Sequence, residues 1–202
     1  MKAWPALCLA LAVASLAVWL AGGPVTSAAH PLAPLVWDAA RWPHQPWTLW
    51  TASLVHLSGG HLLANLLALG ALAVLGCALR AGRAATLALL LAWPLGTLSL
   101  LLWPQITRYS GLSGLIHAMV GVLWASVAIK SGAKSWTVLL FAGLFLKLAS
   151  EHAWSNPIGF SPEWGFNVVY AAHLGGALAG TLCGLLAGGL AQWRQSQPAA
   201  GA

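Results

Sequence analysis

The sequence predicts an all-α integral membrane protein in which six helices cross the membrane. Of its 202 residues, 59% are hydrophobic and only 6% are charged. The mean hydropathy is correspondingly high, at +0.79. So few charged side chains cannot cover a water-soluble globule of this size. We therefore expect one membrane domain over residues 1–202, with six apolar runs as its helices.

The first apolar run covers residues 4–20, close to the ~20 residues that a spanning helix needs. A cleaved signal peptide is the alternative, because Lys2 precedes the run and small residues follow near Ser27. The length of the run favours a retained helix. Both interpretations start the N-terminus in the cytoplasm.

A Pro- and Trp-rich loop follows over residues 22–60 and includes Trp37, Trp42, Trp47 and Trp50. Tryptophan prefers the headgroup layer, so we expect this loop to lie along the membrane surface.

A core of five further helices is predicted over residues 61–190, before a short cytoplasmic tail at 191–202. Its apolar runs cover residues 62–79, 84–103, 112–129, 136–148 and 168–190. The run 136–148 is short for a span and contains Lys147. Pro94 should kink or loosen the run 84–103.

The charged residues predict the orientation of these helices. Alternating loops place on one side Lys2, Arg80, Arg83, Lys130, Lys134 and Arg194. The other side receives Arg41, Arg108 and Lys147, together with the acidic residues Asp38, Glu151 and Glu163. The positive-inside rule makes the first side cytoplasmic, so both termini are expected there. The net charge of +6 is scattered in this way, without a patch that would bind nucleic acid.

Polar side chains inside a membrane are costly and are candidates for function. His61 and Asn65 open the second predicted helix, Ser113 opens the fourth, and His173 lies near the start of the sixth. All three helices start on the outer side in the predicted topology. The four residues are therefore expected at one shallow depth below the outer surface.

Ser113 and His173 have the chemistry of a nucleophile and its base. Serine needs a base within hydrogen-bond reach and a site for the developing oxyanion. Small residues at helical spacing should let the two helices approach closely: Gly176, Gly180 and Gly184 on one, and Gly114, Ala118 and Gly121 on the other. No acidic residue lies within these helices, so a Ser–His dyad is expected in place of a triad.

Several groups could stabilise an oxyanion. Gly111 and Gly114 leave backbone N–H groups accessible near a helix N-terminus. His61 and Asn65 are four residues apart, hence on one helix face, and both can donate. Each residue taken alone has a simpler explanation as a helix cap or an interhelical contact. Their common depth and complementary roles favour catalysis.

Two other classes of function are disfavoured, and no metal or cofactor is expected. His56, His61, His117 and His173 could form a zinc shell, but the chain has no His-Glu-x-x-His element and no carboxylate base among these residues. A transporter would be expected to show paired inverted halves, which the sequence lacks. Cys8, Cys77 and Cys183 lie in apolar runs without metal-type spacing.

Three separated motifs resemble those of the intramembrane rhomboid serine proteases: His56-x4-His61-x3-Asn65, Gly111-Leu112-Ser113-Gly114 and Ala172-His173-x2-Gly176. The resemblance covers about residues 60–190 and implies a six-helix rhomboid-like bundle. It implies that Ser113 is the nucleophile and His173 the general base. The Ser113 N–H, His61 and Asn65 would form the oxyanion hole, and His56 would support the site.

The resemblance also implies a substrate gate formed by the short fifth helix and the loop after it, and a membrane-embedded first loop. Two positions depart from the common family pattern. His117 stands where many members have a tyrosine that packs on the catalytic histidine, and Trp47-Thr48 replaces a Trp-Arg pair. His117 could stack on His173 or act as a second proton relay.

The compact size and the Gly-Leu-Ser-Gly-x-x-His variant are most similar to the rhombosortase branch. That branch implies substrates with a C-terminal Gly-Gly motif, a transmembrane helix and a basic tail, and an acyl-enzyme resolved by water or by an amine. We therefore expect a multi-pass serine endopeptidase of the bacterial inner membrane, surrounded by lipid, with its active site towards the periplasm. The alternatives are a rhomboid protease with other substrates and a non-catalytic rhomboid-like binding protein. The intact pair of Ser113 and His173 favours an enzyme.

Overall fold

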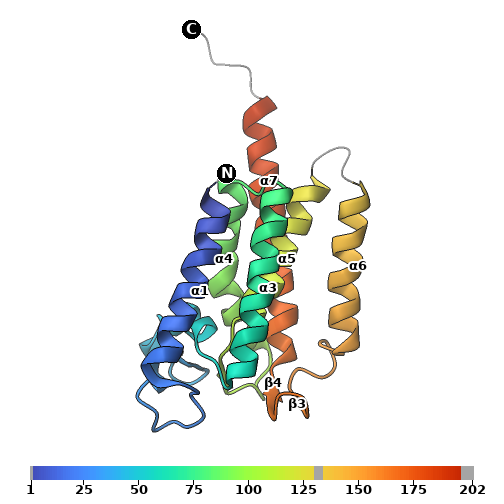
Figure 1. Ribbon diagram of the computed structural model, residues 1–202. Helices are drawn as coiled ribbons and strands as arrows, with labels where there is room; N and C mark the ends of the chain where they lie inside the picture. Colours follow the sequence, from blue (N-terminus) through green and yellow to red (C-terminus); the bar gives the residue numbers. More distant parts are fainter. Residues whose placement is uncertain (1, 130–133, 197–202) are drawn as a thin grey trace.

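A computed structural model describes residues 2–129 and 134–196. Within them lie seven α-helices, which form an all-α bundle (Figure 1). They are α1 (Ala3–Gly22), α2 (Thr48–Thr51), α3 (Gly59–Ala78), α4 (Arg83–Leu98), α5 (Ser113–Ala128), α6 (Lys134–Ser150) and α7 (Tyr170–Ser196). The six long helices coincide with the six predicted apolar runs, and α2 is a single turn in the first loop. Lys130 and residues 197–202 of the predicted tail lie outside the described residues.

Four of these helices are long and apolar enough to cross a membrane: α1, α3, α7, and α4 with its continuation to Leu102. The other two long helices are shorter. α5 has 16 residues and rises about 24 Å, against about 30 Å of bilayer hydrocarbon. The crossing of the membrane by α5 and α6 therefore stays a prediction.

Pro94 lies inside α4, which remains helical to Leu98 and then continues as the 3-10 helix Ser99–Leu102. The predicted kink or loosening at Pro94 itself stays a prediction, because the change of helix type lies five residues later, at Ser99. This change ends α4 just before the segment that leads to α5.

Four short strands, which the sequence did not predict, tie loops to the bundle. In the first loop, β1 (Trp37–Asp38) pairs antiparallel with β2 (Arg108–Tyr109), directly before α5. β3 (Gly159–Ser161) and β4 (Phe166–Val168) form a hairpin directly before α7. Trp37 is fully buried in protein, whereas Trp47 and Trp50 are 47% and 42% exposed. Only part of the Trp-rich loop can therefore face lipid.

The first helix packs as an integral part of the bundle. The Trp4 indole N–H donates to the Leu72 carbonyl of α3 at 3.0 Å, and Gly76 leaves room for the ring. Trp4, Cys8 and Leu11 are buried in the same apolar cluster as Leu69 and Leu72.

The closest helix contact joins α5 and α7, as the pattern of small residues predicts. A Cβ on Gly176 would collide with the Gly114 carbonyl oxygen, and one on Gly180 would collide with that of Ala118. A Cβ on Gly121 would lie 2.6 Å from the Ala177 carbonyl oxygen. The two backbones are therefore as close as glycine allows.

The helices that start with polar residues start at the same end of the bundle. Figure 1 shows the starts of α3 and α7 at the end where β3 and β4 lie, opposite the start of α1 and the end of α7. Two of the three acidic residues pair with nearby cations: Asp38 with Arg41 at 3.1 Å, and Glu151 with Lys147 at 2.8 Å.

The α5–α7 contact predicts opposite effects for the same substitution at two glycines of α7. Gly180→Ala should lower the free energy of unfolding by about 1–3 kcal/mol, because the methyl group meets backbone. Gly189→Ala meets nothing within 4 Å and should be neutral or stabilising by up to about 1 kcal/mol. Thermal unfolding in detergent measures both variants, and equal effects would contradict the packing described.

Candidate active site

Ser113 is the first residue of α5 and follows a tightly held turn. The Gly111 N–H donates to the Ala52 carbonyl at 3.0 Å, and the Tyr109 hydroxyl donates to the Gly111 carbonyl at 2.7 Å. Gly111 has a φ of +122°, which disfavours any other residue. Because the first N–H groups of a helix have no intrahelical acceptor, the Ser113 N–H is available to a ligand.

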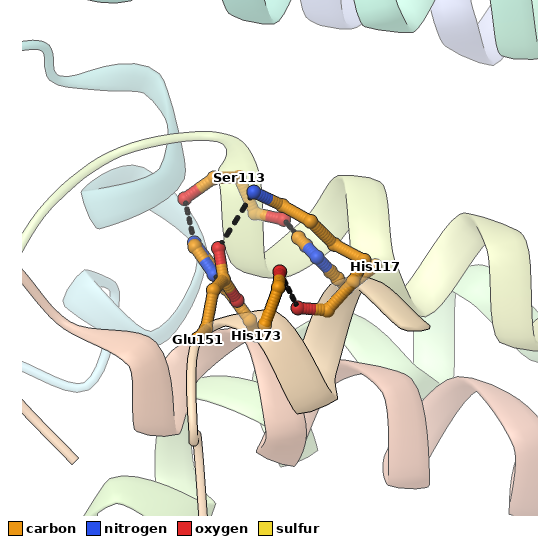
Figure 2. A network of polar contacts seen from close by, with 6 residues as sticks. Ser113, His117, Glu151 and His173 are labelled. Atoms are coloured by element: carbon orange, nitrogen blue, oxygen red, sulfur yellow. Dashed lines mark hydrogen bonds and ion pairs between the residues drawn. The ribbon is translucent and has the colours of Figure 1, made fainter. Parts of the chain in front are cut away.

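His173 lies in the first turn of α7, and its ring faces Ser113 (Figure 2). The distance from the Ser113 Oγ to the His173 Nε2 is 2.9 Å. His173 is buried, with 5% of the residue exposed. The two residues that the sequence singled out as nucleophile and base are thus in direct hydrogen-bond contact.

One acidic residue contacts His173, and the expected dyad did not include it. Glu151, directly after α6, accepts a hydrogen bond from the His173 Nδ1 at 2.7 Å, and its other oxygen is 2.8 Å from the Lys147 Nζ. Glu151 lies outside the helices that carry Ser113 and His173, so the periodicity of those helices does not point to it. The available signal was a Lys–Glu pair at i, i+4 that ends an otherwise apolar helix.

The environment of Glu151 keeps its carboxyl ionised. Burial by itself would raise the pKa of this group. The hydrogen bonds and charges of His173 and Lys147 outweigh burial and lower the pKa of Glu151 to about 2. Glu151 is therefore an acceptor of hydrogen bonds at neutral pH.

His117 stacks on His173, the first of the two roles left open by the sequence. Their ring centroids are 4.2 Å apart and their planes differ by 8°. The His117 Nδ1 lies 2.8 Å from the Ser113 carbonyl oxygen, one turn earlier in α5. A carbonyl only accepts, so the His117 Nδ1 carries a proton that is already donated. This engagement leaves little to support a proton relay through that nitrogen.

His61 and Asn65 share with Ser113 and His173 a cavity of about 810 Å³. Ser58 caps α3 by accepting from the His61 backbone N–H at 3.1 Å, which sets the first turn of the helix. The His61 Nδ1 and the Asn65 Nδ2 are buried and have no hydrogen-bond partner among the described residues. The Asn65 Nδ2 is therefore an unpaired donor on a residue that lines the cavity, and the His61 Nδ1 is a second one in the tautomer that carries its proton there.

His56 packs against the ring of His61. The two rings meet edge to face at 5.1 Å, and the His56 Nδ1 donates to the Leu54 carbonyl at 3.2 Å. Burial lowers the pKa of His56 to about 4, so this ring is neutral and packs as an apolar group.

The β3–β4 hairpin covers the cavity near His61. Trp164 and Phe166 approach the His61 ring with centroid distances of 6.0 Å and 5.2 Å. The segment that the sequence assigned to a gate thus lies over the site, in contact with one of its donors.

The four-histidine zinc shell is not assembled. Its members lie in two ring pairs, His56 with His61 and His117 with His173. Across residues 2–129 and 134–196, one group could offer three metal ligands within 4.8 Å: His117, Glu151 and His173. A metal ion there would have to displace the hydrogen bonds that join Ser113, His173 and Glu151.

Comparison with known proteins gives one match to a family model. The model described as Rhomboid domain matches residues 43–189. This range contains the cavity residues His61, Asn65, Ser113, Glu151 and His173, whereas α1 precedes it. No curated protein matches the chain.

The turn before Ser113 predicts different effects for the same change at the two tyrosines. Tyr109→Phe leaves the Gly111 carbonyl without its buried donor and should lower the free energy of unfolding by about 1–3 kcal/mol. Tyr170 makes no side-chain hydrogen bond within the described part of the chain. Tyr170→Phe should therefore change the free energy of unfolding by less than about 0.5 kcal/mol. Thermal unfolding in detergent compares them, and equal stabilities would exclude the proposed support of the turn.

Proposed function

We propose a function from one premise: the chain belongs to the rhomboid family, whose model matches residues 43–189. Membership supports a membrane protease of the serine intramembrane type, although some rhomboid-like proteins are inactive. We infer that this chain is an active endopeptidase. The observation that carries the proposal is the 2.9 Å contact between the Ser113 Oγ and the His173 Nε2 in an open cavity.

Acylation uses the contact directly. The Ser113 Oγ attacks the carbonyl carbon of the scissile peptide bond while its proton passes to the His173 Nε2. The tetrahedral intermediate then collapses, the C–N bond breaks, and the proton on Nε2 moves to the leaving amine nitrogen. The product is an ester between Ser113 and the new C-terminus of the substrate.

The oxyanion of the intermediate needs donors on the side of Ser113 away from His173. The Ser113 backbone N–H, His61 and Asn65 are proposed for this role. The unpartnered Asn65 Nδ2 supports it, since a buried donor without an acceptor is a preorganised site for developing negative charge. Water then attacks the ester, His173 takes its proton, and Ser113 is released.

Cleavage is proposed near the periplasmic face of the bacterial inner membrane. The positive-inside rule supports this orientation, because the segments beyond the other end of the bundle carry six of the nine Lys and Arg residues of the sequence. At the site end, Asp38 and Glu151 pair with Arg41 and Lys147.

The substrate is proposed to be a transmembrane protein with a C-terminal Gly-Gly sorting signal, as in the rhombosortase branch. The Gly-Leu-Ser-Gly-x-x-His motif supports the branch. The stacking of His117 on His173 is compatible with it. Glycine pairs also weaken helix formation, which lets the peptide bond leave the substrate helix and extend across Ser113.

Removing the nucleophile should abolish cleavage without unfolding the protein. Ser113→Ala should lower the rate about 1,000-fold or more, because no other group forms the acyl-enzyme. Ser110→Ala is the matched control, since Ser110 lines the same cavity and has no role in the proposed reaction. Both variants are compared with the wild type by the rate at which equal amounts of enzyme cleave a membrane substrate. Undiminished cleavage by Ser113→Ala would end the proposal.

The branch predicts the product. Co-expression with a Gly-Gly-tailed membrane protein should release a fragment that ends near the glycines, as read by mass spectrometry of its C-terminus. A free carboxyl indicates hydrolysis, and an added mass indicates transfer to an amine. The same substrate with Leu-Leu in place of Gly-Gly should remain intact. Equal processing of both substrates would contradict the sorting role and would indicate a general rhomboid protease. Processing of neither substrate would also contradict the sorting role.

A further inference from the structure

Glu151 has a place in the site that neither the family match nor the sequence motifs assign. It follows the last residue of α6, and its carboxylate is nearly enclosed, with 8% of the side chain exposed. Both oxygens are engaged: Oε2 with the His173 Nδ1 at 2.7 Å, and Oε1 with the Lys147 Nζ at 2.8 Å. This carboxylate and Ser113 therefore contact different ring nitrogens of His173, Nδ1 and Nε2, in the network drawn in Figure 2.

We propose that Glu151 is a positioning residue for His173, so that the site works as a Ser–His–Glu triad. The inference rests on the proposed function. An ionised carboxylate only accepts hydrogen bonds, so it fixes the proton of the neutral imidazole on Nδ1. Nε2 is then left with a lone pair directed at Ser113. When Nε2 takes the serine proton, the Nδ1 proton stays in place and Glu151 stabilises the imidazolium.

The stacked His117 does not replace this function. A ring that lies parallel at 4.2 Å fixes the plane of His173 but not which nitrogen faces the serine. The Nδ1 of His117 is committed to the Ser113 carbonyl. The two residues therefore constrain His173 in different ways. His117 fixes the plane of the ring, and Glu151 fixes which nitrogen faces Ser113 and which nitrogen carries the proton.

The chain after α6 explains how Glu151 reaches the base. His152 has a φ of +49°, and the Ala153 N–H returns to the Leu148 carbonyl at 3.2 Å, which ends the helix as in a Schellman motif. Leu148 and Ala153 are buried against Ala177 of α7, one turn after His173. This apolar contact anchors the end of α6 beside the base.

The remainder of α6 is loosely covered by protein, since Trp136, Val138, Phe141 and Phe145 are each about half exposed or more. Alignment of the base therefore depends on the docked end of α6, the helix that the sequence assigned to the gate. Movement of this end away from α7 would separate Glu151 from His173 and leave the base unaligned.

The experiment compares Glu151→Gln, Glu151→Asp and Glu163→Gln in the full-length protein in detergent. Glu163 lines the same cavity and, within the described residues, makes no hydrogen bond or ion pair. The readouts are kcat and KM for a membrane substrate and the rate of modification by a small fluorophosphonate. The small probe reports on the nucleophile and its base without substrate docking.

Glu151→Gln should lower kcat and the probe rate together by about 100-fold or more, with KM nearly unchanged, because an amide can stabilise the wrong tautomer. Glu151→Asp keeps the charge and should recover part of the rate. Glu163→Gln should match the wild type. A wild-type probe rate in Glu151→Gln would overturn the proposal and assign Glu151 to substrate entry. Equal losses in the Gln and Asp variants with a lowered unfolding temperature would also overturn it, in favour of a structural role.

If Glu151→Gln does not fold, Lys147→Met tests the same idea. It removes the ammonium that holds the carboxylate and should lower the probe rate several-fold, and an unchanged rate would count against the triad. If the proposed function itself were wrong, the result would differ from all of these, because the wild-type protein would not be modified by the probe.

Discussion

The backbone contact between α5 and α7 is the constraint on which the site depends. Ser113 and His173 lie in the first turns of these two helices, so the distance between the helix backbones sets the distance from hydroxyl to imidazole. Gly176 and Gly180 allow no side chain between the helices at these points. A larger residue would separate the helices, and a hydrogen bond of 2.9 Å could not survive a shift of even 1 Å. Packing and chemistry are therefore specified by the same residues.

The residues around the base divide the remaining task. The turn held by Tyr109 and Gly111 positions the start of α5. Ser58 caps α3 and fixes its first turn, which carries His61. His117 sets the plane of His173, while Glu151 contacts its far nitrogen. Charged groups in a membrane are costly unless they are paired, and here the nearly enclosed Glu151 carboxylate is paired with the Lys147 ammonium. Proximity of ionised and nucleophilic groups in one cavity is what supports an enzyme over a binding protein.

Much of this arrangement could be predicted from the sequence because it follows from helical periodicity. Apolar runs locate the six long helices, and glycines at spacings of four place α7 against α5. The direction of each helix places His61, Ser113 and His173 at one end of the bundle. Glu151 could not be found in this way, since its position depends on a left-handed residue at His152 and on docking of Leu148 against α7. The short strands were missed for a similar reason, because pairs such as Trp37 with Tyr109 are distant in sequence.

The central claim is that Ser113 is a nucleophile activated by His173 within the folded membrane protein. Treating the purified protein with a fluorophosphonate and locating the adduct by peptide mass spectrometry tests it most directly. The account predicts one modified residue, Ser113, and no adduct when His173 is replaced by alanine. Folded wild-type protein without an adduct, or an adduct on Ser113 that persists without His173, would contradict it.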